Sequence, residues 1–174
     1  MKIYTRTGDS GTTGLFSGQR VPKHDLRIEC TGCLDEVNCH LGLAAASDPD
    51  PKIALHIQHL QSHLFELGAD LANPTATPRI TPTHSSELEV QIDEMTAALP
   101  TLRRFILPGG SPAAAHLHLA RSVARRTERV AVALNAESAL PSAILTYLNR
   151  LSDFLFTLAR YQNQLADTPD VEWG

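Results

Sequence analysis

The apolar residues of this chain recur at alternating steps of three and four, the period of a helix that buries one face. Two long segments carry the pattern. The segment from residue 51 to 72 carries Ile53, Ile57, Leu60, Leu64, Leu67 and Leu71. The segment from residue 141 to 165 carries Ile144, Leu148, Leu151, Leu155, Leu158 and Leu165. Helices of this kind bury their apolar faces against one another, so the pattern favours a helical bundle.

Helix start and stop signals divide the rest of the chain into further predicted helices. With the two above, the expected helices span residues 27–47, 51–72, 85–99, 112–134 and 141–165. Pro49 stops the first helix. Ser111 followed by Pro112 supplies an N-cap and a first-turn proline for the fourth. We expect residues 75–82 to form a surface loop.

The first twenty-odd residues differ from the rest of the chain. The segment from Thr5 to Gly14 is built mostly from Gly, Thr and Ser, and it has too little apolar content for a core element. The length suits one domain. We therefore predict a single all-α domain over residues 1–174, with an irregular N-terminal arm at 1–24 and a five-helix bundle at 25–167.

Charge and cysteine content exclude several classes of protein. Fifteen Lys and Arg against nineteen Asp and Glu give a formal net charge of −4, which argues against a general binder of nucleic acid or anionic membranes. No apolar run approaches the length of a membrane span, and no secretory leader opens the chain. Cys30, Cys33 and Cys39 are an odd number in one predicted helix, which is no disulfide framework, and we expect Cys30 and Cys33 to be buried thiols rather than a redox or zinc half-site. We expect a cytoplasmic protein.

Three arginines recur at steps of four on the fourth predicted helix: Arg121, Arg125 and Arg129. Like charges at this spacing repel each other, and Glu128 at the edge of the row can neutralise one of them. Two interpretations remain open. The row is either a solvated flank with ordinary salt bridges, or a site for an anion with several oxygens, such as a polyphosphate.

The N-terminal arm offers a second feature that suits phosphate. Gly8, Gly11 and Gly14 allow close approach of the backbone to a ligand, and neighbouring threonines add hydroxyl donors. The segment is neither a P-loop nor a dinucleotide fingerprint, and such composition is also typical of plain loops. Lys23 is able to reach back towards a phosphate, although an isolated lysine is usually solvated.

Two other polar patterns are ambiguous. His56, His59, His63, Glu66 and Asp70 share one flank of the second helix and are possible metal ligands. A dimetal bundle needs a second Glu-x-x-His helix, which the sequence lacks, so a hydrated flank is favoured. On the last helix, Asn149 and Asp153 lie one turn apart, and their spacing does not decide between an interhelical hydrogen-bond network and a site.

Five segments together resemble a known family. They are Thr5–Asp9 with Gly11–Thr13, Leu34–Asn38, Leu107–Gly110, Ala124–Arg129 and Leu148–Phe156. In this order, and over nearly the whole chain, they resemble the PduO-type ATP:cob(I)alamin adenosyltransferases, also called corrinoid adenosyltransferases. The resemblance implies a ferritin-like, cobalamin adenosyltransferase-like bundle that forms a homotrimer with active sites between subunits.

The resemblance also implies roles for individual residues. In the arm, the residues expected to bind ATP are Thr5, Arg6, Thr7, Gly8, Thr13, Gly14 and Lys23. In the bundle they are Arg125, Arg126, Glu128, Arg129 and Asn149. Magnesium is expected to bind through the phosphates of ATP. The implied catalytic residues are Arg125, Arg129, Phe105 and Asp153.

Three of these roles concern the corrinoid and the subunit boundary. Asp35 resembles the residue that pairs, across the subunit boundary, with the position of Arg125. Asp153 resembles a residue on the corrinoid side. Phe105 matches an aromatic residue that occupies the lower face of the cobalt. Ser10 stands where the family commonly carries a lysine, which puts one phosphate contact in doubt. The family gives no role to His118. It falls within the arginine row by helical angle, so a place at the border of the site is an alternative to the surface position that we expect.

The implied activity is transfer of the 5′-deoxyadenosyl group of ATP to cob(I)alamin, which forms adenosylcobalamin and releases triphosphate. Cob(I)alamin arises by reduction of cob(II)alamin, so a reductase and an adenosylcobalamin-dependent enzyme are expected partners. Two alternatives remain. The chain is a non-catalytic carrier or sensor of nucleotide or corrinoid, or a structural bundle that binds metal through the histidine flank.

Overall fold

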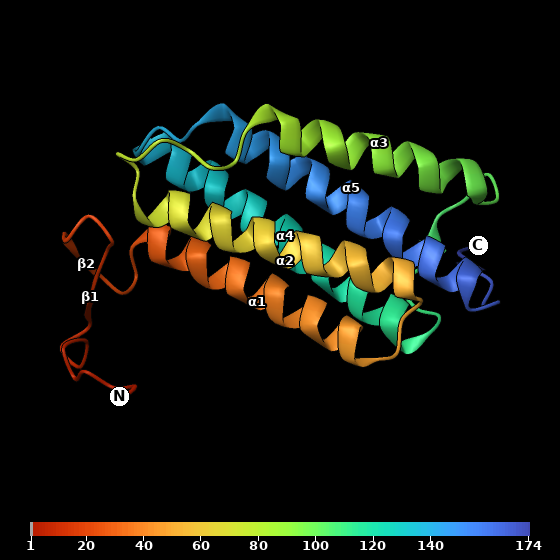
Figure 1. The fold of residues 1–174 in the computed structure, drawn as a ribbon, viewed down its shortest axis with the longest axis horizontal. Coiled ribbons are helices and arrows are strands. Elements are labelled where there is room, and N and C mark those ends of the chain that lie inside the picture. Colours follow the sequence, from red (N-terminus) through yellow and green to blue (C-terminus); the bar gives the residue numbers. More distant parts are fainter. Residues whose placement is uncertain (1) are drawn as a thin grey trace.

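The computed structural model describes residues 2–174 and shows a bundle of five helices (Figure 1). The helices are α1 (Leu26–Ala46), α2 (Pro51–Ala72), α3 (Pro82–Ala98), α4 (Pro112–Glu137) and α5 (Ser142–Leu165). This architecture confirms the predicted all-α bundle. Met1, the first residue of the expected arm, lies outside the described residues. None of the helices within residues 2–174 has the length and apolarity that crossing a membrane requires.

Local capping explains where the helices begin. The side chain of Asp25 accepts a hydrogen bond from Arg27 N at the start of α1, and Ser111 accepts one from Ala114 N at the start of α4. These bonds satisfy main-chain donors that a helix leaves unpaired. The prediction placed the start of α3 three residues too late. Pro82 occupies its first turn, and Thr81 forms a capping box with His84.

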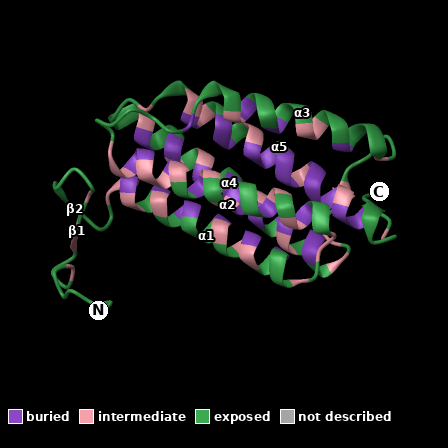
Figure 2. Ribbon diagram, in the orientation of Figure 1, coloured by how far each residue is buried: buried purple, intermediate pink, exposed green. Residues whose placement is uncertain are grey.

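The core lies between α1, α2, α4 and α5, while α3 packs on the outside of α5 (Figures 1 and 2). Leu41, Ile53, Tyr147 and Phe154 are fully buried in it. Helix α3 buries only Ser85, Leu88 and Met95 and is exposed along most of its length, which explains why its sequence pattern was weak. Helix α4 is the central element, because it packs against both α1 and α5.

The N-terminal arm is more regular than its composition predicted. It contains an antiparallel hairpin of β1 (Thr12–Gly14) and β2 (Arg20–Pro22), with Thr13 opposite Val21. Arg20 holds the hairpin to the preceding loop through bonds to Thr7 O and Thr12 Oγ1. The hairpin lies beyond the end of the bundle at which α1 begins, and within residues 2–174 neither strand contacts a helix (Figure 1).

A second short ribbon, which the sequence did not indicate, lies at the other end of the bundle. Strand β3 (Ile106–Leu107) pairs antiparallel with β4 (Val171–Glu172) near the C-terminus. The main-chain N–H of Trp173 also donates to Phe105 O at 2.7 Å. The segment that contains Phe105 is therefore bonded to a part of the chain more than sixty residues away.

The turn between β3 and α4 is fixed by the amide side chain of Asn163. Its Oδ1 accepts from Ser111 N and its Nδ2 donates to Gly109 O, both at 3.0 Å. Gly110 adopts a φ of 106° directly against this amide. A Cβ at residue 110 would lie 2.2 Å from Asn163 Oδ1, so the position requires glycine.

We predict that Gly110→Ala destabilises the protein by about 1–3 kcal/mol, since it combines a strained φ with displacement of the Asn163 amide. The matched control is Gly109→Ala, because a Cβ at residue 109 meets no atom within 4 Å. Urea denaturation at equal protein concentration measures both free energies of unfolding. Equal stability of the two variants would contradict the prediction.

Candidate functional site

The arginine row on α4 is not neutralised by acidic side chains. The side chain of Arg125 makes no hydrogen bond or ion pair within residues 2–174, and Arg129 donates only to Arg125 O, at 3.0 Å. Glu128 forms no ion pair among the described residues and accepts instead from Asn149 Nδ2 at 2.9 Å. Arg125, Glu128, Arg129 and Val132 line a surface hollow of about 300 Å³. The hollow presents two free guanidinium groups, which suits a multivalent anion.

Asn149 and Asp153 of α5 take part in hydrogen bonds that join α5 to neighbouring helices. Asn149 links α5 to α4 through Glu128, as described above. Asp153 accepts from Arg150 Nη1 at 2.5 Å, and Arg150 Nε donates to Glu89 of α3 at 3.0 Å. The hydrogen-bond network that the sequence left open is therefore present, and it places Asn149 at the edge of the hollow.

Arg126 points away from the hollow. Its guanidinium pairs with Glu36 of α1, next to the buried thiol of Cys33. The contact of Arg126 with the nucleotide stays a prediction. Asp35, next to Glu36 in sequence, forms no ion pair in the part of the chain that the structure describes. It lies instead on a mainly apolar groove of about 370 Å³ between α1 and α2, together with Phe16 and Phe65.

The arm gathers most of its predicted nucleotide-binding residues into one loop. The hydroxyls of Thr5 and Thr7 are 2.8 Å apart, Gly8 O accepts from Gly11 N, and the amine of Lys23 folds over Gly8. Arg6 at φ 61° turns the chain between the two threonines. Thr13 and Gly14 lie on β1. No hydrogen bond or ion pair joins this loop to the α4 arginines within residues 2–174, so one chain does not bring the two halves together.

A second cavity of about 400 Å³ lies beside Phe105, which is 79% exposed. It is lined by Leu102, Phe105, Ile106, Pro108, His118, Arg121 and Phe156. Within residues 2–174, neither ring nitrogen of His118 nor Nε of Arg121 has a hydrogen-bond partner. Sequence reasoning missed that these side chains share a cavity with Phe105. The three-residue spacing of His118 and Arg121 on one helix flank was the available signal.

The expectation that His118 lies at the surface was wrong. The residue is only 3% exposed, with its ring packed edge-on to Phe156. Burial, and then the neighbouring charge of Arg121, lower the pKa of His118 to about 4, although Asp170 acts in the opposite direction. Burial and the charge of Arg125 likewise lower the pKa of Arg121. The cavity therefore contains a neutral imidazole at pH 7.

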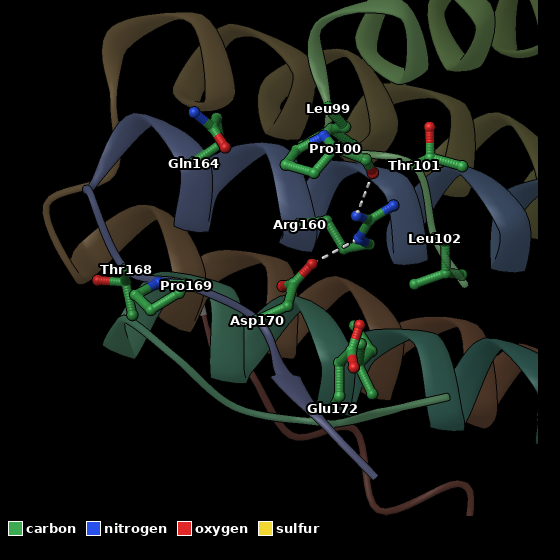
Figure 3. Close-up of a pocket in the computed structure, with 11 residues that line it drawn as sticks. Leu99, Pro100, Thr101, Leu102, Arg160, Gln164, Thr168, Pro169, Asp170 and Glu172 are labelled. Atoms are coloured by element: carbon green, nitrogen blue, oxygen red, sulfur yellow. Dashed lines mark hydrogen bonds and ion pairs between the residues drawn. The ribbon is translucent and has the colours of Figure 1, made fainter. Parts of the chain in front are cut away.

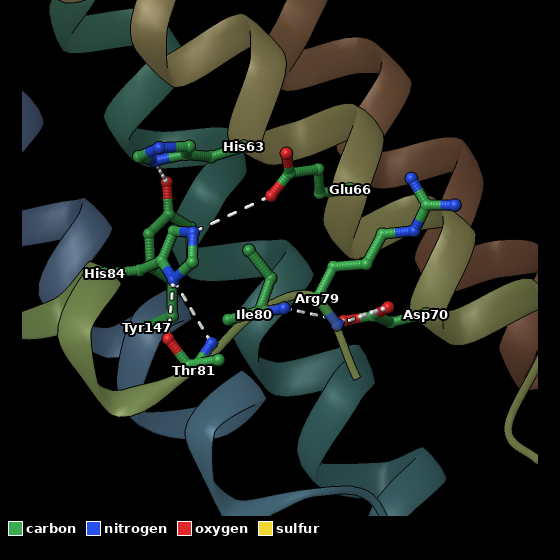
Figure 4. A network of polar contacts seen from close by, with 8 residues as sticks. All are labelled: His63, Glu66, Asp70, Arg79, Ile80, Thr81, His84 and Tyr147. Atoms are coloured by element: carbon green, nitrogen blue, oxygen red, sulfur yellow. Dashed lines mark hydrogen bonds and ion pairs between the residues drawn. The ribbon is translucent and has the colours of Figure 1, made fainter. Parts of the chain in front are cut away.

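On the histidine flank of α2, the side chains of His63, Glu66 and Asp70 make structural contacts with other parts of the chain (Figure 4). His63 Nδ1 lies 3.2 Å from Tyr147 Oη, and Glu66 lies 3.6 Å from His84. The buried carboxylate of Asp70 accepts from the main-chain N–H groups of residues 79 and 80. No group of three metal-binding side chains occurs in residues 2–174. These side chains join α2 to α5, to α3 and to the loop before α3.

The cysteines match their prediction. Cys30 and Cys33 are buried, and all three thiols are free. Burial raises the pKa of Cys30 to about 12, so this thiol stays protonated and unreactive at neutral pH.

Comparison with known proteins identifies the family. The sequence profile described as cobalamin adenosyltransferase matches residues 3–162. The chain belongs to the cobalamin adenosyltransferase family. It is 47% identical to a cobalamin adenosyltransferase of Cupriavidus metallidurans over 99% of this chain and 94% of that protein. It is 48% identical to a corrinoid adenosyltransferase of Mycobacterium leprae, over 93% of this chain and 91% of the relative.

A solved structure has the same fold. It is a phenylalanine-to-alanine variant of the PduO-type ATP:corrinoid adenosyltransferase from Lactobacillus reuteri, complexed with cobalamin and ATP. The two chains superpose with a TM-score of 0.94 at 34% sequence identity, over 99% of each. The family resemblance inferred from the five sequence segments is confirmed.

The buried His118 predicts a pH dependence of stability. Its pKa is about 4 in the folded protein and about 6.5 when unfolded, so between these values the unfolded state binds more protons. The stabilising contribution is complete above pH 6.5 and is lost as the pH falls towards 4. We expect this loss to be on the order of 3 kcal/mol.

The comparison that isolates the effect is with His118→Gln, which cannot titrate. Urea denaturation from pH 7.5 to 4 should show a steeper fall in the free energy of unfolding for the unmodified protein. Parallel curves for the two proteins would show that His118 does not titrate differently on unfolding.

Proposed function

We propose that this chain transfers the 5′-deoxyadenosyl group of ATP to cob(I)alamin, forming adenosylcobalamin and triphosphate. The observation that carries the proposal is the pair of unneutralised guanidinium groups of Arg125 and Arg129 beside the hollow on α4. A triphosphate supplies the several anionic oxygens that such a pair lacks. Family membership and the likeness to a structure complexed with cobalamin and ATP support the same conclusion.

The reaction requires the protein to orient two substrates and to stabilise a leaving group. Cob(I)alamin is a strong nucleophile that attacks the 5′-carbon of ATP, so no side chain needs to act as nucleophile or base. Arg125 and Arg129 stabilise the negative charge that develops on the departing triphosphate. The arm residues Thr5, Thr7, Gly8 and Lys23 hold the nucleotide against them.

The charges around the hollow fit a magnesium ion that arrives with the nucleotide. Magnesium is usually bound through one or two carboxylates together with substrate phosphates. Glu128 is the carboxylate that lines the hollow, and Asn149 orients it through the bond at 2.9 Å. When bound, the ion neutralises part of the phosphate charge.

The exposed ring of Phe105 suits the lower face of the corrinoid. Its side chain has no atom that can ligate cobalt, and it stands at the mouth of a mainly apolar cavity. An apolar group at this face favours four-coordinate cob(II)alamin, which is easier to reduce than the five-coordinate form. We assign Asp153, which accepts a hydrogen bond from Arg150 on α5, to the corrinoid side of the site, as the family resemblance implies.

We place the complete site between subunits of a homotrimer. Three observations support this arrangement: the arm does not meet the α4 arginines of its own chain, Asp35 has no ion-pair partner within residues 2–174, and the groove beside it exposes Phe16 and Phe65. A neighbouring α4 would bring Arg125 to Asp35 and cover the apolar groove. In the cytoplasm, a reductase would supply cob(I)alamin, and an adenosylcobalamin-dependent enzyme would take the product.

We predict that Arg129→Ala lowers the rate of adenosyl transfer by about 10²–10³-fold, the effect of removing one donor that stabilises developing charge. The measurement follows the absorbance change on cobalt alkylation with ATP, Mg²⁺ and pre-reduced cob(I)alamin. Arg79→Ala is the control, because Arg79 is an exposed arginine outside the proposed site. A wild-type rate in Arg129→Ala would contradict the assignment, and binding without transfer in the unmodified protein would indicate a carrier.

Mixed trimers test whether the site is shared. Chains with Arg129→Ala and chains with Lys23→Glu should each be impaired alone. After coexpression, about a quarter of the sites combine an intact arm with an intact α4 if assembly is random, and activity returns in proportion. Absence of any recovery in verified mixed trimers would place both residues in the site of one chain.

Phe105→Ala is expected to slow the reaction that starts from cob(II)alamin and a reductant about tenfold more than the reaction that starts from cob(I)alamin. The reason is that the ring acts on the coordination number of the oxidised substrate and takes no part in alkylation. Parallel assays with the two starting substrates measure the ratio. Equal losses would remove Phe105 from this role.

A further inference from the structure

A buried arginine on α5 lies next to the ribbon that carries Phe105 (Figure 3). Arg160 is only 7% exposed. Its Nε donates to Asp170 Oδ2 at 2.6 Å, and its Nη2 donates to Pro100 O at 2.9 Å. The proposed mechanism uses none of these three residues.

The two partners of Arg160 lie in the two chain segments that lead into the strands of the ribbon. Pro100 begins the segment that follows α3 and leads to Phe105 and β3. Asp170 directly precedes β4, which pairs with β3. One guanidinium group on α5 therefore bonds both the residue that precedes β4 and the segment that leads to Phe105 and β3.

The position of Phe105 depends on this ribbon. Its ring is 79% exposed, so packing against the rest of its own chain does little to hold it. Its main-chain oxygen accepts from Trp173 N at 2.7 Å, and the next two residues pair with β4. The contacts run from Arg160 through Asp170 and β4 to the backbone of Phe105.

The Arg160–Asp170 ion pair is largely buried, so it strongly restricts the positions of both side chains. The two side chains are 8% and 19% exposed, so loss of one partner leaves a largely buried charge uncompensated. A second pair in the same ribbon, Arg104–Glu172, lies at 3.8 Å with both side chains more than half exposed. An exposed pair of this kind contributes little to stability or position.

We propose that Arg160 is a positioning residue that holds the ring of Phe105 at the cobalt face of the corrinoid by anchoring the start of β4 and the segment that leads to Phe105. This inference rests on the proposed role of Phe105. The step that depends on it is the gain of one electron by cob(II)alamin from a low-potential one-electron reductant, with loss of the axial cobalt ligand to solvent. If the ribbon loosens, the ring moves away and an axial ligand returns to the cobalt. Alkylation of cob(I)alamin does not need the ring.

The experiment uses the chain of residues 1–174 with Asp170→Ala as the main variant, because Asp170 lies outside the five helices. Arg160→Gln is the second variant, and Arg104→Ala is the matched control. We expect Asp170→Ala and Arg160→Gln to slow the reaction from cob(II)alamin selectively by up to about tenfold, no more than Phe105→Ala does, because both act through the position of the ring. The rate from pre-reduced cob(I)alamin and the KM for ATP should change by less than about twofold, as should both rates for Arg104→Ala.

Two further measurements separate positioning from general damage. Electron paramagnetic resonance of protein with ATP and cob(II)alamin should show less of the four-coordinate species in both variants. Without any substrate, fluorescence anisotropy of Trp173, the single tryptophan of the chain, should fall when β4 is released. The double variant Phe105→Ala/Asp170→Ala should be no slower from cob(II)alamin than Phe105→Ala alone, because Asp170 acts through Phe105.

The outcomes distinguish the inference from the proposed function. If Phe105→Ala shows no selective loss from cob(II)alamin, the proposed role of Phe105 fails and the inference fails with it. If Phe105→Ala shows that loss while Asp170→Ala and Arg160→Gln do not, the inference alone is overturned. Equal slowing from both substrates, or additive effects in the double variant, would also overturn it, because either result indicates a purely structural role.

Discussion

The electrostatic repulsion along α4 is the constraint on which the proposed site depends. Arg121, Arg125 and Arg129 follow one flank of the helix, and burial of Ala120 and Ala124 against α1 and α5 prevents that flank from turning inward. The protein leaves most of this charge unneutralised, although Glu36 nearby takes up Arg126. A polyanion bound at the proposed site would relieve this repulsion. The packing of α4 therefore fixes the arginines in a position that favours binding of the nucleotide.

The two halves of the proposed nucleotide site are built from different kinds of structure. The α4 half is held by the core, whereas the arm is a hairpin whose strands contact no helix within residues 2–174. Although Phe16, between the two strands, lines the groove between α1 and α2, the strands themselves are available to a neighbouring bundle. The exposed apolar groove beside Asp35 is available for the same contact. Subunit assembly and completion of the site would then be one event.

The corrinoid side is organised by single polar side chains that reach from α5. Asn163 fixes the turn before α4, and Arg160 bonds the residue before β4 and the segment that leads to Phe105. Between these anchors, Phe105 is exposed and His118 is buried without a partner among the described residues. The segments that border the cavity are thus held by hydrogen bonds, while its lining includes an imidazole without a partner among the described residues. This arrangement suits the large flat substrate that we propose for it.

The sequence by itself determined the helices and the arginine row, because each depends on a pattern that repeats within a few residues. It determined the family through five segments that occur in order along the chain. The apolar period of α2 gave its bounds correctly, and the spacing of Arg125 and Arg129 gave their common flank. Only the tertiary structure decided that His118 is buried and that β3 pairs with β4. These features depend on contacts between residues far apart in the chain, and the local sequence around either partner carries no signal of the other.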